Sequence, residues 1–262
     1  MASRNGVDLH YERTGDGPRL LYCNGSGTTL DTVRPLLDVL GGSFELLAFD
    51  HRGMGRSTCA HEPYAMADLA ADVASLLDEV GWDRCRVAGL SFGGMVAQEV
   101  AVTFPDRVER LALLCTSPGG GFPSYPLEEL ADLPEDERMQ RSMLLADRRW
   151  TPEWLAAHPD QQGLVQAFAD RRPSGETDDQ RWGRIAQLAC RSDHDVLDRL
   201  ARVTAPTFVG AGAYDDIAPV ANAEVIVERV PDAALHVYDG GHAFVVQDPT
   251  ALPQVIEFLA AG

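Results

Sequence analysis

One serine in this sequence stands in a setting that could make it a nucleophile. Residues 89–93, Gly-Leu-Ser-Phe-Gly, have the form G-x-S-x-G with Ser91 at the centre. An apolar run precedes this pentapeptide and a helical pattern follows it, so a sharp strand-to-helix turn is expected. The flanking glycines would let the backbone pass closely without a Cβ clash and leave the hydroxyl exposed. We therefore predict that Ser91 is a catalytic nucleophile, in preference to an incidental serine in a tight turn.

A serine hydroxyl needs a base to take its proton, and the base needs an acid to orient it. Of the seven histidines, His242 is the best placed, because it follows the last predicted strand and a Gly-Gly pair. An acid at the end of the preceding strand would give the chain order Ser, Asp, His. Asp215 and Asp216 both stand there, and the offset from Gly212 and Pro219 favours Asp215. The simpler interpretation of either aspartate is an N-cap for the next helix.

A glycine-rich turn could stabilise the negative charge that such a reaction develops. Residues 24–27, Asn-Gly-Ser-Gly, end a predicted strand that should lie beside the strand leading to Ser91. Backbone N–H groups in this turn, together with the N–H of Phe92, could bind a tetrahedral oxyanion. A plain turn is the alternative. The segment 50–57, Asp-His-Arg-Gly-Met-Gly-Arg-Ser, is expected to be a supporting loop, since it lacks the GxxxxGK[ST] pattern of a phosphate site.

The elements that must position these residues alternate between apolar runs and helical patterns. Such alternation is typical of an α/β protein with a mostly parallel sheet, and α/β sheets place their chemistry in loops at the carboxyl ends of the strands. The predicted strands are 7–12, 20–23, 44–49, 84–90, 108–115, 207–212 and 234–238. The predicted helices are 30–40, 66–80, 93–104, 221–230 and 251–260, identified by apolar residues at helical spacing.

The alternation of strands and helices is interrupted between residues 119 and 201, where the sequence is polar and contains no candidate strand. Short helices are predicted at 126–148, 152–157, 161–171 and 178–191. We expect one α/β domain, residues 1–118 and 202–262, interrupted by a helical cap or lid of residues 119–201. Candidate substrate-binding residues are Asn24 and, in the lid, Trp150, Trp154 and Trp182. An arginine of the lid, at 148, 149, 171 or 172, could bind a substrate carboxylate, although packing aromatics and solvated arginines are the simpler interpretation.

Composition limits the possible functions. The 262 residues carry a net charge of −18, which opposes binding to nucleic acid and to anionic membranes. There is no lysine, so Schiff-base and lysine-nucleophile mechanisms are excluded. The five cysteines are scattered without a CxxC pair, so neither a metal site nor a disulfide framework is expected. The first eight residues lack the apolar region typical of a signal peptide, and no apolar run approaches the length of a membrane span, so a cytoplasmic location is expected.

In this order along the chain, the segments 24–27, 50–57, 89–95, 212–219 and 240–242 resemble the α/β-hydrolase superfamily. Within it, the chain is similar to small esterases, 3-oxoadipate enol-lactonase-like lactonases and cofactor-free haloperoxidases. The resemblance covers residues 1–118 and 202–262 but not the insertion. It implies an α/β-hydrolase fold with a mostly parallel sheet flanked by helices. It also implies that Ser91, Asp215 and His242 are nucleophile, acid and base, and that the N–H groups of Ser26 and Phe92 are the oxyanion donors.

The chain departs from the pattern of that superfamily at two places. Many members have His-Gly where this chain has Asn24-Gly25, although asparagine is common in the enol-lactonase branch. Because the donor there is a backbone N–H, the change need not affect catalysis. Glu-x-Pro is more usual where this chain has Gln-Asp-Pro at 247–249, a difference expected to be structural.

The expected activity is cleavage of a carboxylic ester, lactone or thioester of a small molecule through an acyl-enzyme, with no metal or organic cofactor. The same triad could also serve C–C bond hydrolysis or perhydrolysis, and a non-catalytic small-molecule-binding protein is a further alternative. A serine at position 91 disfavours epoxide hydrolase or haloalkane dehalogenase chemistry, for which the resemblance would require aspartate. The physiological substrate, the residues lining the pocket and the oligomeric state are not defined by the sequence.

Overall fold

A computed structural model of the chain describes all residues except 1, 5, 131–132 and 170–176. The strands are β1 (Ala2–Arg4), β2 (Val7–Leu9), β3 (Tyr11–Thr14), β4 (Arg19–Cys23), β5 (Glu45–Phe49), β6 (Cys85–Leu90), β7 (Val108–Leu114), β8 (Thr207–Gly212) and β9 (Ala233–Tyr238). The α-helices are α1 (Arg34–Gly41), α2 (Met66–Glu79), α3 (Phe92–Thr103), α4 (Glu135–Ala146), α5 (Pro152–Ala157), α6 (Gln162–Ala169), α7 (Asp178–Ser192), α8 (Val220–Arg229), α9 (Phe244–Gln247) and α10 (Ala251–Ala260). Short 3₁₀ helices are η1 (Pro105–Arg107), η2 (Leu127–Leu130), η3 (Pro159–Gln161) and η4 (Leu197–Arg202).

The main sheet has seven strands in the order β3-β5-β4-β6-β7-β8-β9. Strand β3 runs antiparallel to β5, and every other neighbouring pair is parallel. The sequence-based expectation of a mostly parallel sheet in an α/β-hydrolase fold is confirmed. Strand β6, which leads to Ser91, lies in the middle of this sheet between β4 and β7.

The predicted strand 7–12 is wrong as a single element. It is divided at His10 into β2, which pairs with β1 in a separate two-stranded sheet, and β3, which joins the main sheet. The break has a physical cause, because the backbone of His10 bonds outside the ladder. Its N–H donates to the Ser57 hydroxyl at 2.9 Å, and its carbonyl accepts from the N–H of Asp50 at 2.9 Å.

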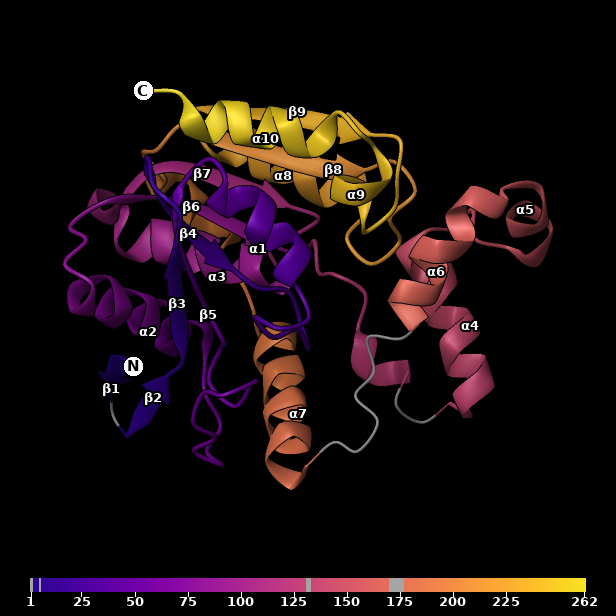
Figure 1. Ribbon diagram of the computed structural model, residues 1–262, viewed down its shortest axis with the longest axis horizontal. Coiled ribbons are helices and arrows are strands. Elements are labelled where there is room, and N and C mark those ends of the chain that lie inside the picture. The colour runs from indigo at the N-terminus through magenta and orange to yellow at the C-terminus, as the bar shows by residue number, and fades with distance from the viewer. Residues whose placement is uncertain (1, 5, 131–132, 170–176) are drawn as a thin grey trace.

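Helices cover both faces of the main sheet (Figure 1). Helices α2, α3 and α8 pack on one face, whereas α1, α9 and α10 pack on the other. Alternate side chains of β4 enter the two layers, with Leu21 and Cys23 on the first face and Leu20 and Tyr22 on the second. Burial on both faces explains why this strand is a continuous apolar run in the sequence.

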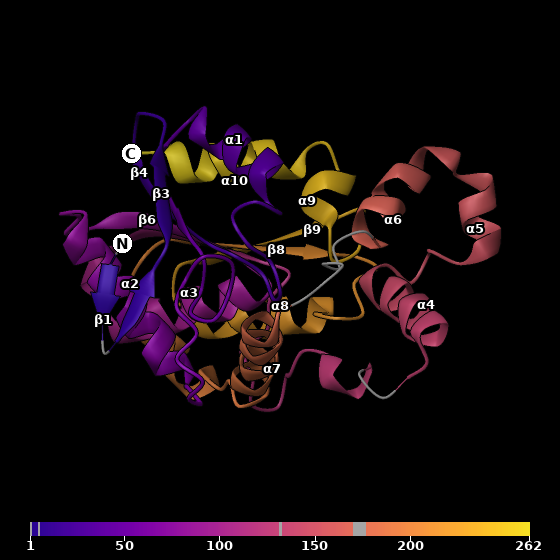
Figure 2. The same cartoon turned by 60° about the horizontal axis from the view of Figure 1, so that its bottom comes forward.

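Between β7 and β8 the regular elements of the described residues are helices, and the only bridges among these residues are isolated pairs of Gly119 with Phe122 and Asp195. The predicted helix 126–148 is wrong in extent, because the segment contains η2 and α4, and Pro134 directly precedes α4. A residue before proline is disfavoured in helical conformation. Figure 2 shows α4, α5 and α6 grouped at one side of the molecule, with α7 apart from them. Residues 190, 196 and 200 of α7 and the segment after it belong to the core of the main sheet.

Candidate active site

Ser91 occupies a strained turn between β6 and α3. Its backbone has φ 56° and ψ −115°, in the region that non-glycine residues rarely adopt. The N–H of Ser91 donates to the carbonyl of Leu114 on β7 at 2.8 Å, which fixes the turn against the neighbouring strand. A Cβ on Gly89 would lie 2.2 Å from the Gly93 carbonyl oxygen, and one on Gly93 would lie 2.0 Å from the Cys23 carbonyl oxygen. Both glycines are therefore required for the close approach of the turn.

Ser91, His242 and Asp215 form a continuous hydrogen-bonded chain. The Nε2 of His242 is 2.9 Å from the Ser91 Oγ, and its Nδ1 is 2.7 Å from the Asp215 Oδ2. The other oxygen of Asp215, a residue 1% exposed, accepts from the N–H groups of Ile217 at 2.8 Å and Ala218 at 2.9 Å. A carboxylate on the Nδ1 side assigns the ring proton to Nδ1, which leaves Nε2 free to accept from the serine hydroxyl.

The structure gives different positions to Asp215, which the sequence favoured as the acid, and Asp216. Asp216 lies at the surface, where its Oδ1 is 3.2 Å from the Nη1 of Arg148. Helix α8 begins after Pro219 and has no side-chain cap, so neither aspartate is its N-cap. Asp215 is the one brought to His242.

The loop that carries His242 is held by the carboxyl end of α4. The N–H of His242 donates to the carbonyl of Ala146 at 2.6 Å. A Cβ on Gly241 would lie 2.0 Å from that carbonyl oxygen, so the contact requires glycine. Gln247 accepts from the N–H of Gly241 at 2.7 Å and donates to Asp147 at 2.8 Å. The glutamine that departs from the usual Glu-x-Pro thus ties the His242 loop to the residue that follows α4.

The turn after β4 lies beside the nucleophile. A Cβ on Gly25 would lie 3.8 Å from the Ser91 Cβ. Phe92 is the first residue of α3, so its N–H has no carbonyl partner within the helix. Asn24 is fully buried, and its side-chain amide donates to the Phe49 carbonyl at 2.9 Å. Its side chain therefore supports the turn from within.

The loop after β5 supports the same turn. His51 is fully buried, and its Nε2 donates to the Asn24 carbonyl at 3.0 Å. Burial lowers the pKa of His51 to about 4, so the ring stays neutral. Asp50 accepts from the backbone N–H groups of Leu30 at 2.8 Å and Arg56 at 3.0 Å. This network agrees with the supporting role expected for residues 50–57.

A model of the alpha/beta hydrolase fold family matches residues 18–249. The chain belongs to this family. It is 30% identical over 243 residues to a poly(3-hydroxyalkanoate) depolymerase of Ectopseudomonas oleovorans, with 92% of this chain and 83% of that protein covered. It is 26% identical over 254 residues to 3-oxoadipate enol-lactonase 2 of Acinetobacter baylyi, with 96% and 92% covered.

A crystal structure of a hydrolase from Pseudomonas aeruginosa superposes with a TM-score of 0.76 at 31% identity, covering 100% of this chain and 97% of that one. The resemblance to the α/β-hydrolase superfamily seen in the sequence is thus confirmed. The chain is a hydrolase of this fold.

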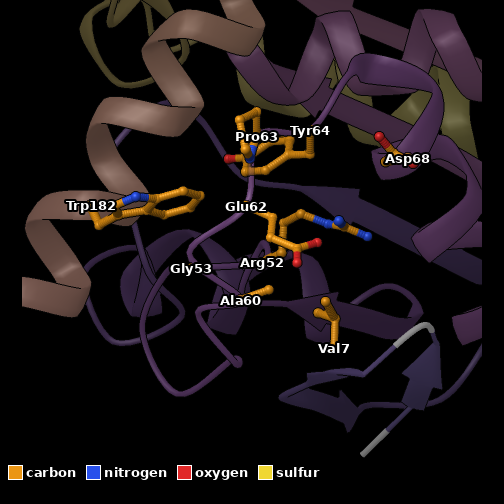
Figure 3. A pocket seen from close by; sticks show the side chains of 9 residues that line it. All are labelled: Val7, Arg52, Gly53, Ala60, Glu62, Pro63, Tyr64, Asp68 and Trp182. Carbon is orange, nitrogen blue, oxygen red and sulfur yellow. The ribbon is translucent and has the colours of Figure 1, made fainter.

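The tryptophans expected to line a pocket of this hydrolase have packing partners. Trp150 is buried in a small apolar cluster with Leu145 at the end of α4 and Ile217 after β8. Trp154 stacks on His158, with ring centroids 4.0 Å apart. Trp182 lines a separate cavity of about 160 Å³, whose other lining residues are Val7, Arg52, Gly53, Ala60, Glu62, Pro63, Tyr64 and Asp68 (Figure 3). Substrate contact by Trp154 and Trp182 stays a prediction, whereas the burial of Trp150 favours a packing role.

The lid arginines suggested for a carboxylate already face acids. Arg148 pairs with Asp216, and Arg149 pairs with Asp147 and Asp239, both at 2.7 Å. Arg171 and Arg172 lie outside the described residues. The structure also buries two polar side chains of α7, Gln187 and Arg191. The helical periodicity of the sequence did not indicate that they are buried.

One group among the described residues has the composition of a metal site. Ligand atoms of Cys59, His61 and Asp179 lie within 4.8 Å of one another, where the loop after β5 meets the start of α7. The Nε2 of His61 is 2.7 Å from an oxygen of Asp179, and both side chains are exposed. None of these residues belongs to the hydrogen-bonded chain of Ser91. In the part of the chain that the structure describes, no helix is both long and apolar enough to cross a bilayer.

Proposed function

We propose that this hydrolase cleaves a carboxylic ester, lactone or thioester of a small molecule, with Ser91 as nucleophile. The observation that carries the proposal is the hydrogen-bonded chain from Ser91 through His242 to Asp215. Its parts come from three separate loops at the carboxyl ends of β6, β8 and β9, which is where an α/β fold places chemistry. The names of the relatives, a depolymerase and a lactonase, support this substrate class.

In the proposed reaction, Nε2 of His242 accepts the proton of the Ser91 hydroxyl while Oγ attacks the carbonyl carbon. Asp215 stabilises the imidazolium through Nδ1, and the N–H groups of Ile217 and Ala218 keep its carboxylate oriented. The imidazolium then protonates the leaving alcohol or thiol, which gives an acyl-enzyme. Water attacks that ester with His242 as base, releasing the acid and restoring Ser91.

The developing oxyanion would be bound by two backbone N–H groups, those of Ser26 and Phe92. The position of Phe92 at the start of α3 and the packing of Gly25 against Ser91 support this assignment. Fixed donors of this kind stabilise charge without reorganisation during the reaction.

The test is turnover of short-chain aryl esters and of lactones, followed by covalent labelling with a fluorophosphonate. Ser91→Ala should lose nearly all turnover and all labelling, since the label forms a bond to the serine oxygen. A slow residual rate of up to 10³- to 10⁴-fold above water is expected from the oxyanion site and binding. Labelling of another residue, or a variant with more than about a tenth of wild-type kcat, would place the nucleophile elsewhere. Turnover that requires peroxide would indicate a perhydrolase instead.

A further inference from the structure

Helix α7 buries polar side chains and exposes an apolar one. Gln187 and Arg191 are 1% and 4% exposed, whereas Ile185 is 53% exposed. Burying an amide or a guanidinium costs free energy unless hydrogen bonds and charges satisfy it. A helix that packs for stability alone turns its apolar residues inward. The burial of Gln187 and Arg191, beside the buried Cys190, therefore needs a reason other than apolar packing.

Gln187 is fixed to the turn that follows β4. Its Oε1 accepts from the N–H of Gly27 at 2.7 Å, one residue after the proposed oxyanion donor Ser26. Its Nε2 is buried and has no hydrogen-bond partner among the described residues. The amide is thus oriented by its oxygen and keeps its N–H donors unused.

Arg191 is the one arginine that is buried in the described ranges of the chain. Its Nη1 donates to the Tyr125 carbonyl at 2.8 Å, but its Nε and Nη2 are buried without a described partner. Burial lowers the pKa of Arg191 to about 10, while the charges of Glu128 and Asp215 act in the opposite direction. Glu128 accepts from the Ser192 hydroxyl and Asp215 from His242, so both carboxylates are engaged elsewhere.

Both side chains are tied to the loops of the active site. The N–H of Tyr125 donates to the Ile217 carbonyl at 2.8 Å, and the N–H of Ile217 binds Asp215. Arg191 is thereby connected to the acid loop, as Gln187 is connected to the turn beside Ser91. Residues four apart lie on the same side of a helix. The unused donors thus lie along one side of α7, between the turn after β4 and the acid loop.

We propose that Gln187 and Arg191 form a subsite for a carboxylate, so that the ester or lactone cleaved by this enzyme is itself anionic. The proposal rests on the ester hydrolysis proposed above. The Nε and Nη2 of a guanidinium form the fork that binds both oxygens of a carboxylate, and the Gln187 amide adds a further donor. The ligand would supply a carboxylate bonded directly to Nε and Nη2 of Arg191, which no described acid reaches. It would also explain how a chain of net charge −18 holds an anion, which its overall field repels.

The experiment compares aryl esters that differ in one charge. Mono-4-nitrophenyl succinate, glutarate and adipate carry a free carboxylate, and their methyl esters mask it at nearly the same length. For at least one length, wild-type kcat/KM should favour the anionic ester on the order of 10- to 100-fold, the range for hydrogen bonds to a charged group. Arg191→Gln should lower kcat/KM for the anionic ester at least about tenfold more than for the neutral ester, which removes the preference. Arg148→Gln is the matched control, because its guanidinium pairs with Asp216 at the surface, and it should keep the preference.

The outcomes separate this subsite from the proposed function. A wild type that cleaves the neutral esters with no preference for the anionic ones would overturn the subsite and leave the esterase intact. Turnover of neither ester would overturn both. Equal losses on both esters in Arg191→Gln would make the residue structural and would also overturn the subsite.

A second measurement uses only the wild-type enzyme, so its result does not depend on whether a variant folds. With wild-type enzyme and the neutral ester as substrate, the dicarboxylate that matches the preferred length should inhibit competitively. Sodium chloride at equal ionic strength should not inhibit. Absence of competition by all three dicarboxylates would contradict the proposal.

Discussion

Asp215 accepts a hydrogen bond from His242 at 2.7 Å, whereas the aspartate that follows it in the chain pairs with a surface arginine. This relationship predicts very different results for two identical substitutions. Asp215→Asn keeps the shape of the acid but presents a neutral amide to the imidazole, which then favours the wrong tautomer. In comparable triads the loss in kcat is about 10⁴-fold.

Asp216→Asn is the matched control, since the side chain is exposed and its ion pair contributes little stability. Its kcat should stay within about threefold of wild type. Steady-state kinetics of both variants on one aryl ester, with circular dichroism to verify folding, measure the difference. Similar losses in the two variants, or the reverse order, would show that the acid is misassigned.

A second prediction concerns the close contact between the elbow and β4. In Gly93→Ala, the new Cβ would meet the Cys23 carbonyl oxygen at 2.0 Å, so backbone must move. We expect a loss of 1–3 kcal/mol or more in the free energy of unfolding, as for overpacked cores. The same displacement would separate Ser91 from the oxyanion turn and lower kcat.

Gly121→Ala is the control for this substitution, because nothing lies within 4 Å of its new Cβ. Urea denaturation of both variants gives the comparison. If Gly93→Ala were as stable and as active as Gly121→Ala, the tight approach would not exist in solution.

The sequence predicted well those elements whose signal is local. Strands β4 to β8 are buried on both faces, so their apolar runs stand out, and the G-x-S-x-G pentapeptide gave the turn at Ser91 directly. Asp215 was preferred only by its offset from neighbouring residues, and its contact with His242, 27 residues later, is visible only in three dimensions.

Features that depend on distant partners were missed. The predicted helix 30–40 begins only at Arg34, because the N–H of Leu30 is bound by Asp50 and Pro35 prefers the first turn of a helix. The strand break at His10 likewise serves the loop of residues 50–57. Gln187 and Arg191 could not be predicted, since periodicity assigns polar residues of a helix to solvent and their partners lie more than 60 residues away.

The buried ring of His51 predicts a pH dependence of stability. Its pKa is lowered from an ordinary value of 6.5 to about 4 in the folded protein. Between these values the unfolded chain binds a proton that the folded chain does not, so stability is lost as the pH falls from 6.5 to 4. The loss from this residue is about 3 kcal/mol over the whole window. Burial also lowers the pKa of His194 to about 4, and it acts in the same direction.

His51→Gln isolates the first contribution, because the glutamine amide can still donate to the Asn24 carbonyl but does not titrate. Urea unfolding of wild type and variant at several pH values between 7 and 4 gives the two slopes. The variant should lose less stability on acidification, whatever its stability at pH 7. Parallel curves would mean that His51 titrates normally in the folded protein.

The last prediction distinguishes packing from substrate contact in the cap. Trp150 is buried with Leu145 and Ile217, next to the α4 end that holds the His242 loop. Trp150→Ala should therefore lower the free energy of unfolding by about 3–5 kcal/mol, as for other buried aromatics.

Trp182→Ala is the control, since that ring is only partly buried and should cost less. The kcat/KM values across a graded series of acyl chains measure discrimination between substrates. We expect Trp150→Ala to keep the wild-type order of preference among acyl chains while it loses stability. A changed order with little loss of stability would instead place Trp150 in the substrate pocket, because a residue that only packs the cap has no contact through which to sense the length of an acyl chain.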